Sequence, residues 1–145
     1  MMEGKIEKLR RYAGRGDEGE LLEEMILTAS EGIEGNYIQG GEKQVCLCTS
    51  EARNWMQEQT EKGLCFRRFN ENILISGMDP EMLKLGTLIA AGDAVLKVTA
   101  LKPCFDECIL HSNNRYCMLS VSAKFLSVEK SGSIKADGTI SILNP

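Results

Sequence analysis

The sequence predicts a mostly β fold, a barrel or a sandwich that carries a few short helices (α+β by content). One observation is a series of short β-rich runs from residue 72 onward, separated by Gly, Pro and Asp at short intervals. Another is that only Ser50 to Lys62 has the apolar spacing and end signals of a clear helix. The length of 145 residues suits a single domain over residues 1–145.

The composition is that of an ordinary globular chain. Hydrophobic residues make up 43% and charged residues 26%, enough apolar content to bury a core. Seventeen Lys and Arg stand against 21 Asp and Glu, a net charge of −4. The chain therefore has no overall basic field, and we expect no nucleic-acid partner.

The sequence also predicts a cytoplasmic protein without a membrane partner. Its first residues are charged throughout and lack the apolar stretch of a secretory signal. Apolar runs such as Leu88–Ala91 are far shorter than the roughly 20 residues of a membrane-spanning helix. In a reducing compartment the six cysteines are expected to be thiols rather than disulfides.

The N-terminal part leaves two elements open. Lys5–Tyr12 is compatible with an edge strand or one helical turn, and Leu21–Thr28 with a helix or a strand. Gly14–Gly19 has three glycines in six residues, which predicts an exposed loop. Cys46 and Cys48 are two positions apart, so on a strand both face one side, which we take as a core face.

The helix predicted over Ser50–Lys62 has signals at both ends. Thr49 or Ser50 can cap its first turn, and Gly63 offers a stop at its C-terminus. Its apolar stripe includes the only tryptophan, Trp55, which we therefore expect to pack in the core.

The C-terminal half predicts several strands joined by tight turns. Ala91–Asp93 is predicted to turn a hairpin, and Ser131–Gly132 and Asp137–Gly138 to form two further turns. The predicted strands are 72–75, 87–90, 94–99, 121–128 and 139–143.

Cysteines carry the most reactive chemistry in the chain. Cys104 follows a predicted strand and lies near Lys102, whose ammonium can favour a nucleophilic thiolate. Cys104 and Cys108 also have the spacing of half a zinc site, which His111 or Cys117 could extend; a second close pair exists only if Cys46 and Cys48 are brought across from the other half of the chain. Cys117 is a further candidate thiol to act together with Cys104. The remaining three, Cys46, Cys48 and Cys65, are predicted to be core or incidental thiols.

Other candidate motifs are weaker. Arg67 and Arg68 on a strand point to opposite faces, so one of them can line a pocket and grip a phosphate or carboxylate. The single histidine, His111, is expected to have a surface or hydrogen-bonding role rather than a catalytic one. Phosphate-loop and dinucleotide fingerprints are absent from the sequence, so nucleotide hydrolysis is not expected.

Six blocks of the chain form a pattern when taken in order. They are Gly32–Asn36, Lys43–Leu47, Phe69–Ile73, Leu85–Gly86, Ala91–Thr99 and Lys102–Cys104. The pattern resembles a divergent, small bacterial-type MOSC domain, a module named for the C-terminal part of molybdenum-cofactor sulfurases. The most specific part is Phe-x-Glu-Asn followed by Gly-Asp-Ala-Val-Leu-x-Val-Thr and a cysteine.

The resemblance implies a barrel-like fold with a cleft for the pyranopterin molybdenum cofactor. The family cysteine, which is proposed to carry sulfur as a persulfide, falls on Cys104, and a second family cysteine falls on Cys108. The family Glu-Asn pair falls on Glu71 and Asn72. The resemblance does not imply direct binding of pyridoxal phosphate. Our own candidates for holding the anionic part of a ligand are Arg68, Lys102 and Arg115.

Two family blocks are altered in this chain. Where the family usually has Gly-Asp-x-His, this chain has Gly35, Asn36, Tyr37 and Ile38. A block Cys-x-Met-Pro-Arg-Glu-Gly of small members has become 117–123, without its Arg and Glu. We therefore expect the chain to keep the scaffold and the family thiol while lacking the Asp, His, Arg and Glu of the family.

Three hypotheses follow. The first is a sulfur carrier for molybdenum-cofactor chemistry that uses Cys104, with a cysteine desulfurase or a molybdoenzyme as partner and a monomer or weak dimer as the state. The second is a non-catalytic module that binds a pterin or the cofactor. The third is a small structural zinc protein.

Overall fold

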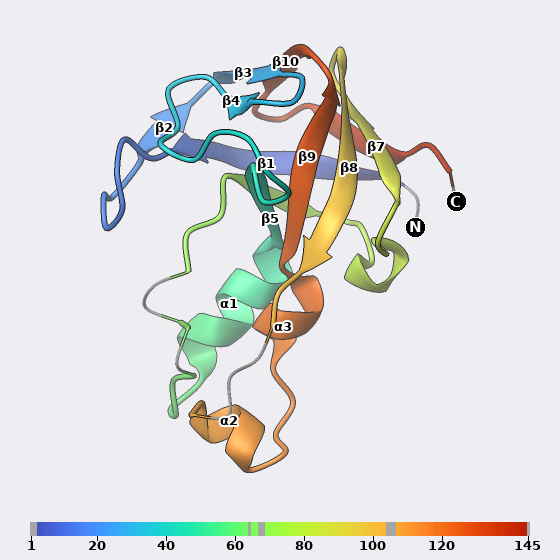
Figure 1. Cartoon of the computed structure of the whole chain (residues 1–145). Helices are drawn as coiled ribbons and strands as arrows, with labels where there is room; N and C mark the ends of the chain where they lie inside the picture. The colour runs from blue at the N-terminus through green and yellow to red at the C-terminus, as the bar shows by residue number, and fades with distance from the viewer. Residues whose placement is uncertain (1–2, 64, 67–68, 104–106, 145) are drawn as a thin grey trace.

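The computed structural model describes residues 3–63, 65–66, 69–103 and 107–144 and confirms a mostly β fold (Figure 1). The strands are β1 (Glu3–Arg11), β2 (Glu20–Leu22), β3 (Glu24–Thr28), β4 (Gly32–Ile33), β5 (Val45–Thr49), β6 (Ile73–Ser76), β7 (Leu88–Ala91), β8 (Ala94–Leu101), β9 (Lys124–Lys130), β10 (Gly132–Lys135) and β11 (Thr139–Ile142). The helices are α1 (Ser50–Glu58), α2 (Ile109–Ser112), α3 (Met118–Ser122) and a 3₁₀ turn η1 (Pro80–Met82).

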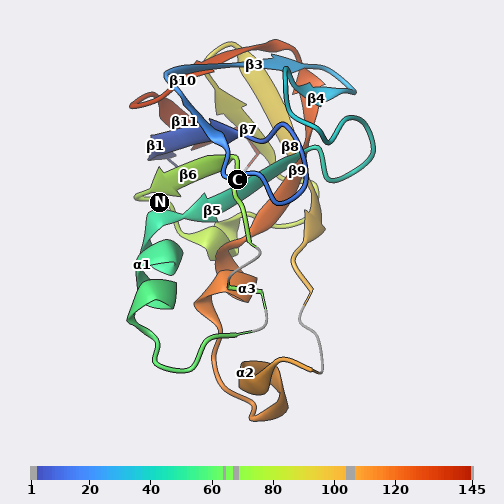
Figure 2. The ribbon, with the colours of Figure 1, turned by 90° about the vertical axis from the view of Figure 1, so that its left-hand side faces the viewer.

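Seven strands close into a barrel, which decides between the two predicted architectures. Their order is β1, β6, β5, β9, β8, β7 and β11, and β11 pairs back onto β1. The β5–β6 pair is parallel and the other barrel pairs are antiparallel. A second, three-stranded sheet consists of β10, β3 and β4. Figures 1 and 2 show α1, α2 and α3 gathered below the barrel, at one end of the molecule.

The N-terminal segment is a strand, one of its two predicted forms, but it is not an edge strand. β1 pairs with β6 on one side and with β11 and β2 on the other. Leu21–Thr28, which the sequence left open between a helix and a strand, is extended and is divided between β2 and β3. The predicted loop over Gly14–Gly19 contains no helix or strand.

Strand β5 lies between two hydrophobic cores, and all five of its residues are buried. Val45 and Leu47 point into the barrel core, which fills the space between the seven strands. Cys48 points the other way, into a helix-side core, as expected for the opposite face of a strand. The helix-side core consists of Cys48, Ala52, Met56, Phe66, Leu74, Cys108, Leu110, Leu119 and Ala123.

Helix α1 begins where the sequence predicts. Thr49 Oγ1 accepts a hydrogen bond from the backbone N of Ala52 at 3.2 Å, an N-cap that satisfies one donor of the first turn. Ala52 is buried in the helix-side core, and Trp55 packs against it. The ring of Trp55 meets that of Phe66 edge-on, with 5.7 Å between centroids.

The same helix ends at Glu58, so its predicted end at Lys62 is wrong. Gln59 is extended, with φ −75° and ψ 135°. Side-chain donors bind the carbonyl groups of the last turn instead. Gln59 Nε2 donates a hydrogen bond to the carbonyl of Trp55 at 3.1 Å, and Lys62 Nζ donates one to the carbonyl of Met56 at 2.8 Å. These donors replace the backbone bonds that a longer helix would make.

The predicted C-terminal strands are present, with one correction. The prediction of a strand over 121–128 is wrong at its start, because Met118–Ser122 forms α3 and the strand begins at Lys124. Helix α3 packs against α1, a tertiary contact that favours the helical turn. The hairpin predicted at Ala91–Asp93 is confirmed, with Ala91 opposite Ala94 and Gly92 at φ +55°.

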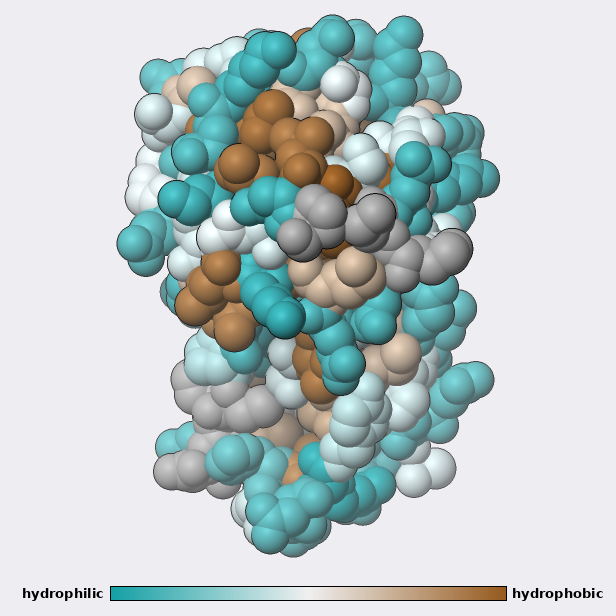
Figure 3. All heavy atoms as spheres, turned by 90° about the vertical axis from the view of Figure 1, so that its right-hand side faces the viewer, coloured by the Kyte–Doolittle hydropathy of each residue, from teal (hydrophilic) through white to brown (hydrophobic). Residues whose placement is uncertain are grey.

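No helix in the described part of the chain is long and apolar enough to cross a membrane. On the face nearest β7, hydrophilic residues predominate, and apolar residues gather in small groups on the barrel half (Figure 3).

Candidate functional site

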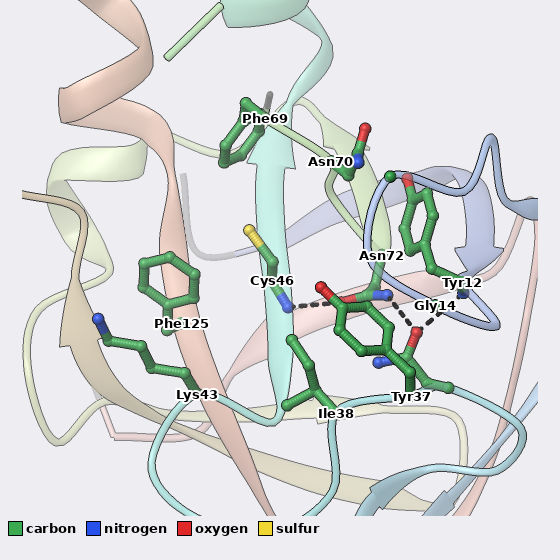
Figure 4. Close-up of a pocket in the computed structure, with 12 residues that line it drawn as sticks. Tyr12, Gly14, Tyr37, Ile38, Lys43, Cys46, Phe69, Asn70, Asn72 and Phe125 are labelled. Carbon is green, nitrogen blue, oxygen red and sulfur yellow. Dashed lines mark hydrogen bonds between the residues drawn. The ribbon is translucent and has the colours of Figure 1, made fainter. Parts of the chain in front are cut away.

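Two cavities hold most of the predicted site residues that the structure describes. We call the first, of about 270 Å³, the aromatic cavity (Figure 4); it is lined by Tyr12, Gly14, Gly16, Asn36, Tyr37, Ile38, Lys43, Cys46, Phe69, Asn70, Asn72 and Phe125. We call the second, of about 200 Å³, the thiol cavity; it is lined by Gly63, Cys65, Phe66, Lys102, Cys108, Leu110, His111, Arg115, Cys117, Leu119 and Ser120.

Asn72, a predicted ligand-binding residue, lies in the wall of the aromatic cavity and is only 6% exposed. Its Oδ1 accepts a hydrogen bond from the backbone N of Cys46 at 2.9 Å, and its Nδ2 donates to the carbonyl of Arg10 at 3.1 Å. The amide thus ties β1, β5 and the start of β6 together. In this arrangement Asn72 acts on the cavity by positioning its walls.

Glu71, the other member of the predicted pair, lies outside the aromatic cavity. Its carboxylate forms an ion pair with Arg53 and lines a separate groove beside β1 and α1. Its backbone carbonyl accepts a hydrogen bond from the hydroxyl of Tyr12 at 2.9 Å. Burial, and then the charge of Glu71, raise the pKa of Tyr12 to about 12, so this phenol stays protonated at neutral pH.

Aromatic rings form much of the first cavity. Figure 4 shows Tyr12, Tyr37, Phe69 and Phe125 around its space, with the sulfur of Cys46 directed between Phe69 and Phe125. Such walls suit a flat heterocycle, because ring faces stack favourably. Phe69 and Tyr37 lie in the family blocks, but no sequence pattern predicted that the four rings would meet, since they come from segments far apart in the chain.

Polar groups in the same cavity are few. Lys43 places its Nζ 5.0 Å from the ring centroid of Phe125, where it supplies a cation at the cavity. Burial raises the pKa of the Cys46 thiol well above its ordinary value, and the nearby Cys48 and Glu71 raise it further. Cys46 therefore offers a neutral thiol, which is a poor nucleophile.

Two of the altered family positions line this cavity. Asn36 is buried, and its Oδ1 accepts a hydrogen bond from the backbone N of Tyr12 at 2.9 Å. Ile38 presents an aliphatic side chain where the family usually has a histidine. The cavity is consequently neutral at one altered position and apolar at the other.

The thiol cavity brings together Lys102, Cys108 and Arg115, three of the predicted ligand-binding residues. Lys102 Nζ lies 3.1 Å from the Sγ of Cys65. Arg115 forms an ion pair with Glu61, and both side chains remain partly exposed. The importance of Cys65 was missed, because its position 37 residues before Lys102 gives no local signal.

Cys117 and His111 also line the thiol cavity, so the suggested companion thiol and the single histidine lie beside the predicted residues. The predicted Cys104 and Arg68 lie outside the described residues. Lys102 and Cys108, which flank Cys104 in the sequence, both line this cavity.

The zinc hypothesis gains no support from the residues that the structure describes. Within that part of the chain, no three His, Cys, Asp or Glu side chains are grouped so as to hold a metal ion. Cys46, Cys48, Cys65 and Cys117 are thiols rather than halves of disulfides.

Comparisons with known proteins agree with the fold. The sequence model of the MOSC domain matches residues 34–141. The crystal structure of the YuaD protein from Bacillus subtilis superposes with a TM-score of 0.66 at 17% identity, covering 97% of this chain and 96% of that one. YiiM from Escherichia coli gives a TM-score of 0.65 at 19% identity, covering 97% and 70%. No curated protein sequence matches the chain. At such identities the solved structures show a shared fold alone.

Proposed function

The chain belongs to the MOSC domain family, a family linked to molybdenum-cofactor sulfurase-like functions, and we propose that it carries sulfur for molybdenum-cofactor chemistry on Cys104. The partner would be a cysteine desulfurase that donates the sulfur or a molybdoenzyme that receives it. The observation that carries the proposal is the thiol cavity, because Lys102 and Cys108, on either side of Cys104 in sequence, both line it with Arg115.

The proposed chemistry is a persulfide exchange. The Cys104 thiolate attacks the outer sulfur of a desulfurase persulfide, a new S–S bond forms on Cys104, and the donor cysteine leaves as a thiolate that takes up a proton. A second thiolate then attacks the outer sulfur and becomes the new persulfide, while Cys104 leaves as a thiolate, so that no net oxidation or reduction occurs. Lys102 and Arg115 supply positive charge for the thiolates and for an anionic ligand.

The residues present also fit the cofactor that the family implies. The aromatic cavity offers ring faces for a flat pterin, and Lys43 offers a cation for an anionic tail. When bound, that cofactor would supply the molybdenum chemistry for which the sulfur is carried. The protein's own contribution is to hold the ring system and to keep water from its apolar faces.

Sulfur loading tests the proposal. The full-length chain and its Cys104→Ala variant are incubated with a cysteine desulfurase and cysteine, and persulfides are mapped by peptide mass spectrometry. We expect a persulfide on Cys104 and its loss in the variant. Cys48→Ala is the matched control, because Cys48 is fully buried in the helix-side core and should load normally. Equal total loading of the Cys104→Ala variant would contradict the assignment.

A module that binds a pterin without sulfur chemistry is the second candidate. It is favoured by the aromatic cavity, where Asn36 and Ile38 replace the acidic and histidine positions of the family. Calorimetric titration with pterin-6-carboxylate distinguishes the two functions. The binder predicts that Phe125→Ala weakens binding by about tenfold while Cys104→Ala leaves it unchanged. Persulfide loading that depends on Cys104 would reject this candidate as the whole function.

A further inference from the structure

The thiol cavity contains a cysteine that the proposed function does not use. Cys65 is partly exposed, and its Sγ accepts a contact from Lys102 Nζ at 3.1 Å. We propose that Cys65 is a second reactive thiol, which forms mixed disulfides with small anionic disulfides. This proposal stands on the contacts of Cys65 and does not depend on Cys104 as a sulfur carrier.

The first support is the position of Lys102. A thiolate is the form of cysteine that attacks disulfides, and an adjacent ammonium group stabilises the charge on its sulfur. Lys102 Nζ also contacts the carbonyl of Pro103 at 3.1 Å, which holds the ammonium group beside the sulfur. The lysine is therefore oriented toward the Cys65 sulfur before any reagent arrives.

The second support is the charge of the cavity. Lys102 and Arg115 line it, and no acidic side chain is among its described lining residues. Glu61 lies nearby and offsets Arg115 through their ion pair. An ammonium group beside the attacking sulfur favours a reagent that is anionic over a neutral or cationic one of the same size.

The third support is the shape and polarity of the space. The cavity has about 200 Å³ and apolar walls that include Phe66, Leu110 and Leu119. A space of this size can take one half of a small disulfide. Apolar walls lower the local dielectric, which strengthens the attraction between the basic side chains and an anion.

The reaction balances without any further reagent. The Cys65 thiolate attacks one sulfur of R–S–S–R, the S–S bond of the reagent breaks, and a new bond joins Cys65 to S–R. The other half leaves as RS⁻ with the electron pair and is protonated by solvent. Cys65 is thus oxidised to a mixed disulfide while one half of the reagent is reduced to a thiol.

Three disulfides of similar size and different charge test the proposal: dithiodipropionate, hydroxyethyl disulfide and cystamine. The full-length Cys104→Ala protein is treated with each, rates are divided by those for free cysteine, and adducts are mapped by peptide mass. We expect Cys65 to be modified first and the dianionic reagent to react about fivefold or more faster than the neutral one. Cystamine should be slowest.

Substitutions of the ammonium group give the sharper result. Lys102→Met should slow the dianionic reagent about fivefold or more, whereas Lys102→Arg should retain most of the rate. Lys130→Met is the control, because Lys130 is exposed at the end of β9 and outside the cavity lining. If Lys102→Met does not fold, added salt should still slow dithiodipropionate, but not hydroxyethyl disulfide, in the Cys104→Ala protein.

The proposal is overturned if Cys117 reacts faster than Cys65, or if neither Lys102→Met nor salt changes the rate. Since Cys104 is absent from these samples, such a result leaves the sulfur-carrier function untouched. Conversely, failure of sulfur loading on Cys104 leaves the reactivity of Cys65 untouched.

Discussion

Asn72 and Cys46 form two hydrogen bonds with each other in the barrel wall, where β5 lies beside β6. Asn72 Oδ1 accepts from the backbone N of Cys46 at 2.9 Å, and the backbone N of Asn72 donates to the carbonyl of Cys46 at 2.8 Å. The two residues are 26 positions apart in the chain. The double contact fixes the position where β6 begins beside β5, which is also a wall of the aromatic cavity.

Replacing Asn72 by Ala should destabilise the fold. The change leaves the backbone N of Cys46 and the carbonyl of Arg10 without their side-chain partners. We expect a loss of about 2 to 4 kcal/mol in the free energy of unfolding, measured by urea denaturation. Asn70→Ala is the control, because Asn70 is exposed and should change stability by less than about 0.5 kcal/mol. Equal effects of the two changes would refute the positioning role.

Tyr12 should make stability depend on pH in the alkaline range. Its pKa is raised from 10.0 to about 12, so the unfolded chain releases this proton before the folded protein does. The stabilisation is complete below pH 10 and is lost as the pH rises toward 12. Tyr12→Phe should therefore show a shallower fall of unfolding free energy over that range. Tyr116→Phe, at an exposed position, should retain the steep fall.

Gly92 should be intolerant of substitution. It turns the β7–β8 hairpin at φ +55°, and a Cβ there would collide with the carbonyl oxygen of Ser133. Gly92→Ala should cost about 1 to 3 kcal/mol in the free energy of unfolding. Gly14→Ala is the matched control, since nothing lies near its Cβ position. A thermal melt that shifts equally for both would show that the hairpin is not strained.

Lys124 should be replaceable by an apolar residue without loss of stability. It is 7% exposed, and burial lowers its pKa, with the charge of Glu81 acting in the opposite direction. Lys124→Met should maintain or raise the free energy of unfolding at pH 7, by about 1 kcal/mol.

The pH dependence gives Lys124 an independent check. Because the unfolded chain holds the Lys124 proton more tightly than the folded protein does, the original chain gains stability as the pH rises toward 10.5. The gap between Lys124→Met and the original chain should therefore narrow in alkaline buffer. A gap that widens there would contradict the prediction, and Lys130→Met, at an exposed position, should show no such trend.

Local sequence patterns correctly predicted the elements whose conformation follows from local residue preferences. β7, β8 and β11 are short runs of β-favouring residues between turn signals, and they lie where the sequence predicts them. The short strands β4 and β10 were missed, because their pairing with β3 is what makes them strands. Likewise, α3 depends on its contact with α1, so the local run over 121–128 was misleading at its start.

The candidate site was predictable only in part. Lys102 and Cys108 lie close in sequence, and both reach the thiol cavity. Glu71 and Asn72 are adjacent, yet one faces a groove and the other the aromatic cavity, since neighbouring side chains of an extended chain point in opposite directions. Sequence spacing did not predict that Cys65, from a remote segment, would line the thiol cavity with Lys102 and Cys108.

Two features could be obtained from the sequence by itself. The order of its blocks resembles the MOSC family, and its β-favouring runs and turn residues, which act locally, predict a β-rich fold. Tertiary packing determined the rest. The pairing of β5 with β6 places Asn72 beside Cys46, and the chain after α1 lies beside the end of β8, where Lys102 meets Cys65; these contacts span 26 and 37 positions. They depend on how segments far apart in the sequence pack together, which no local segment determines.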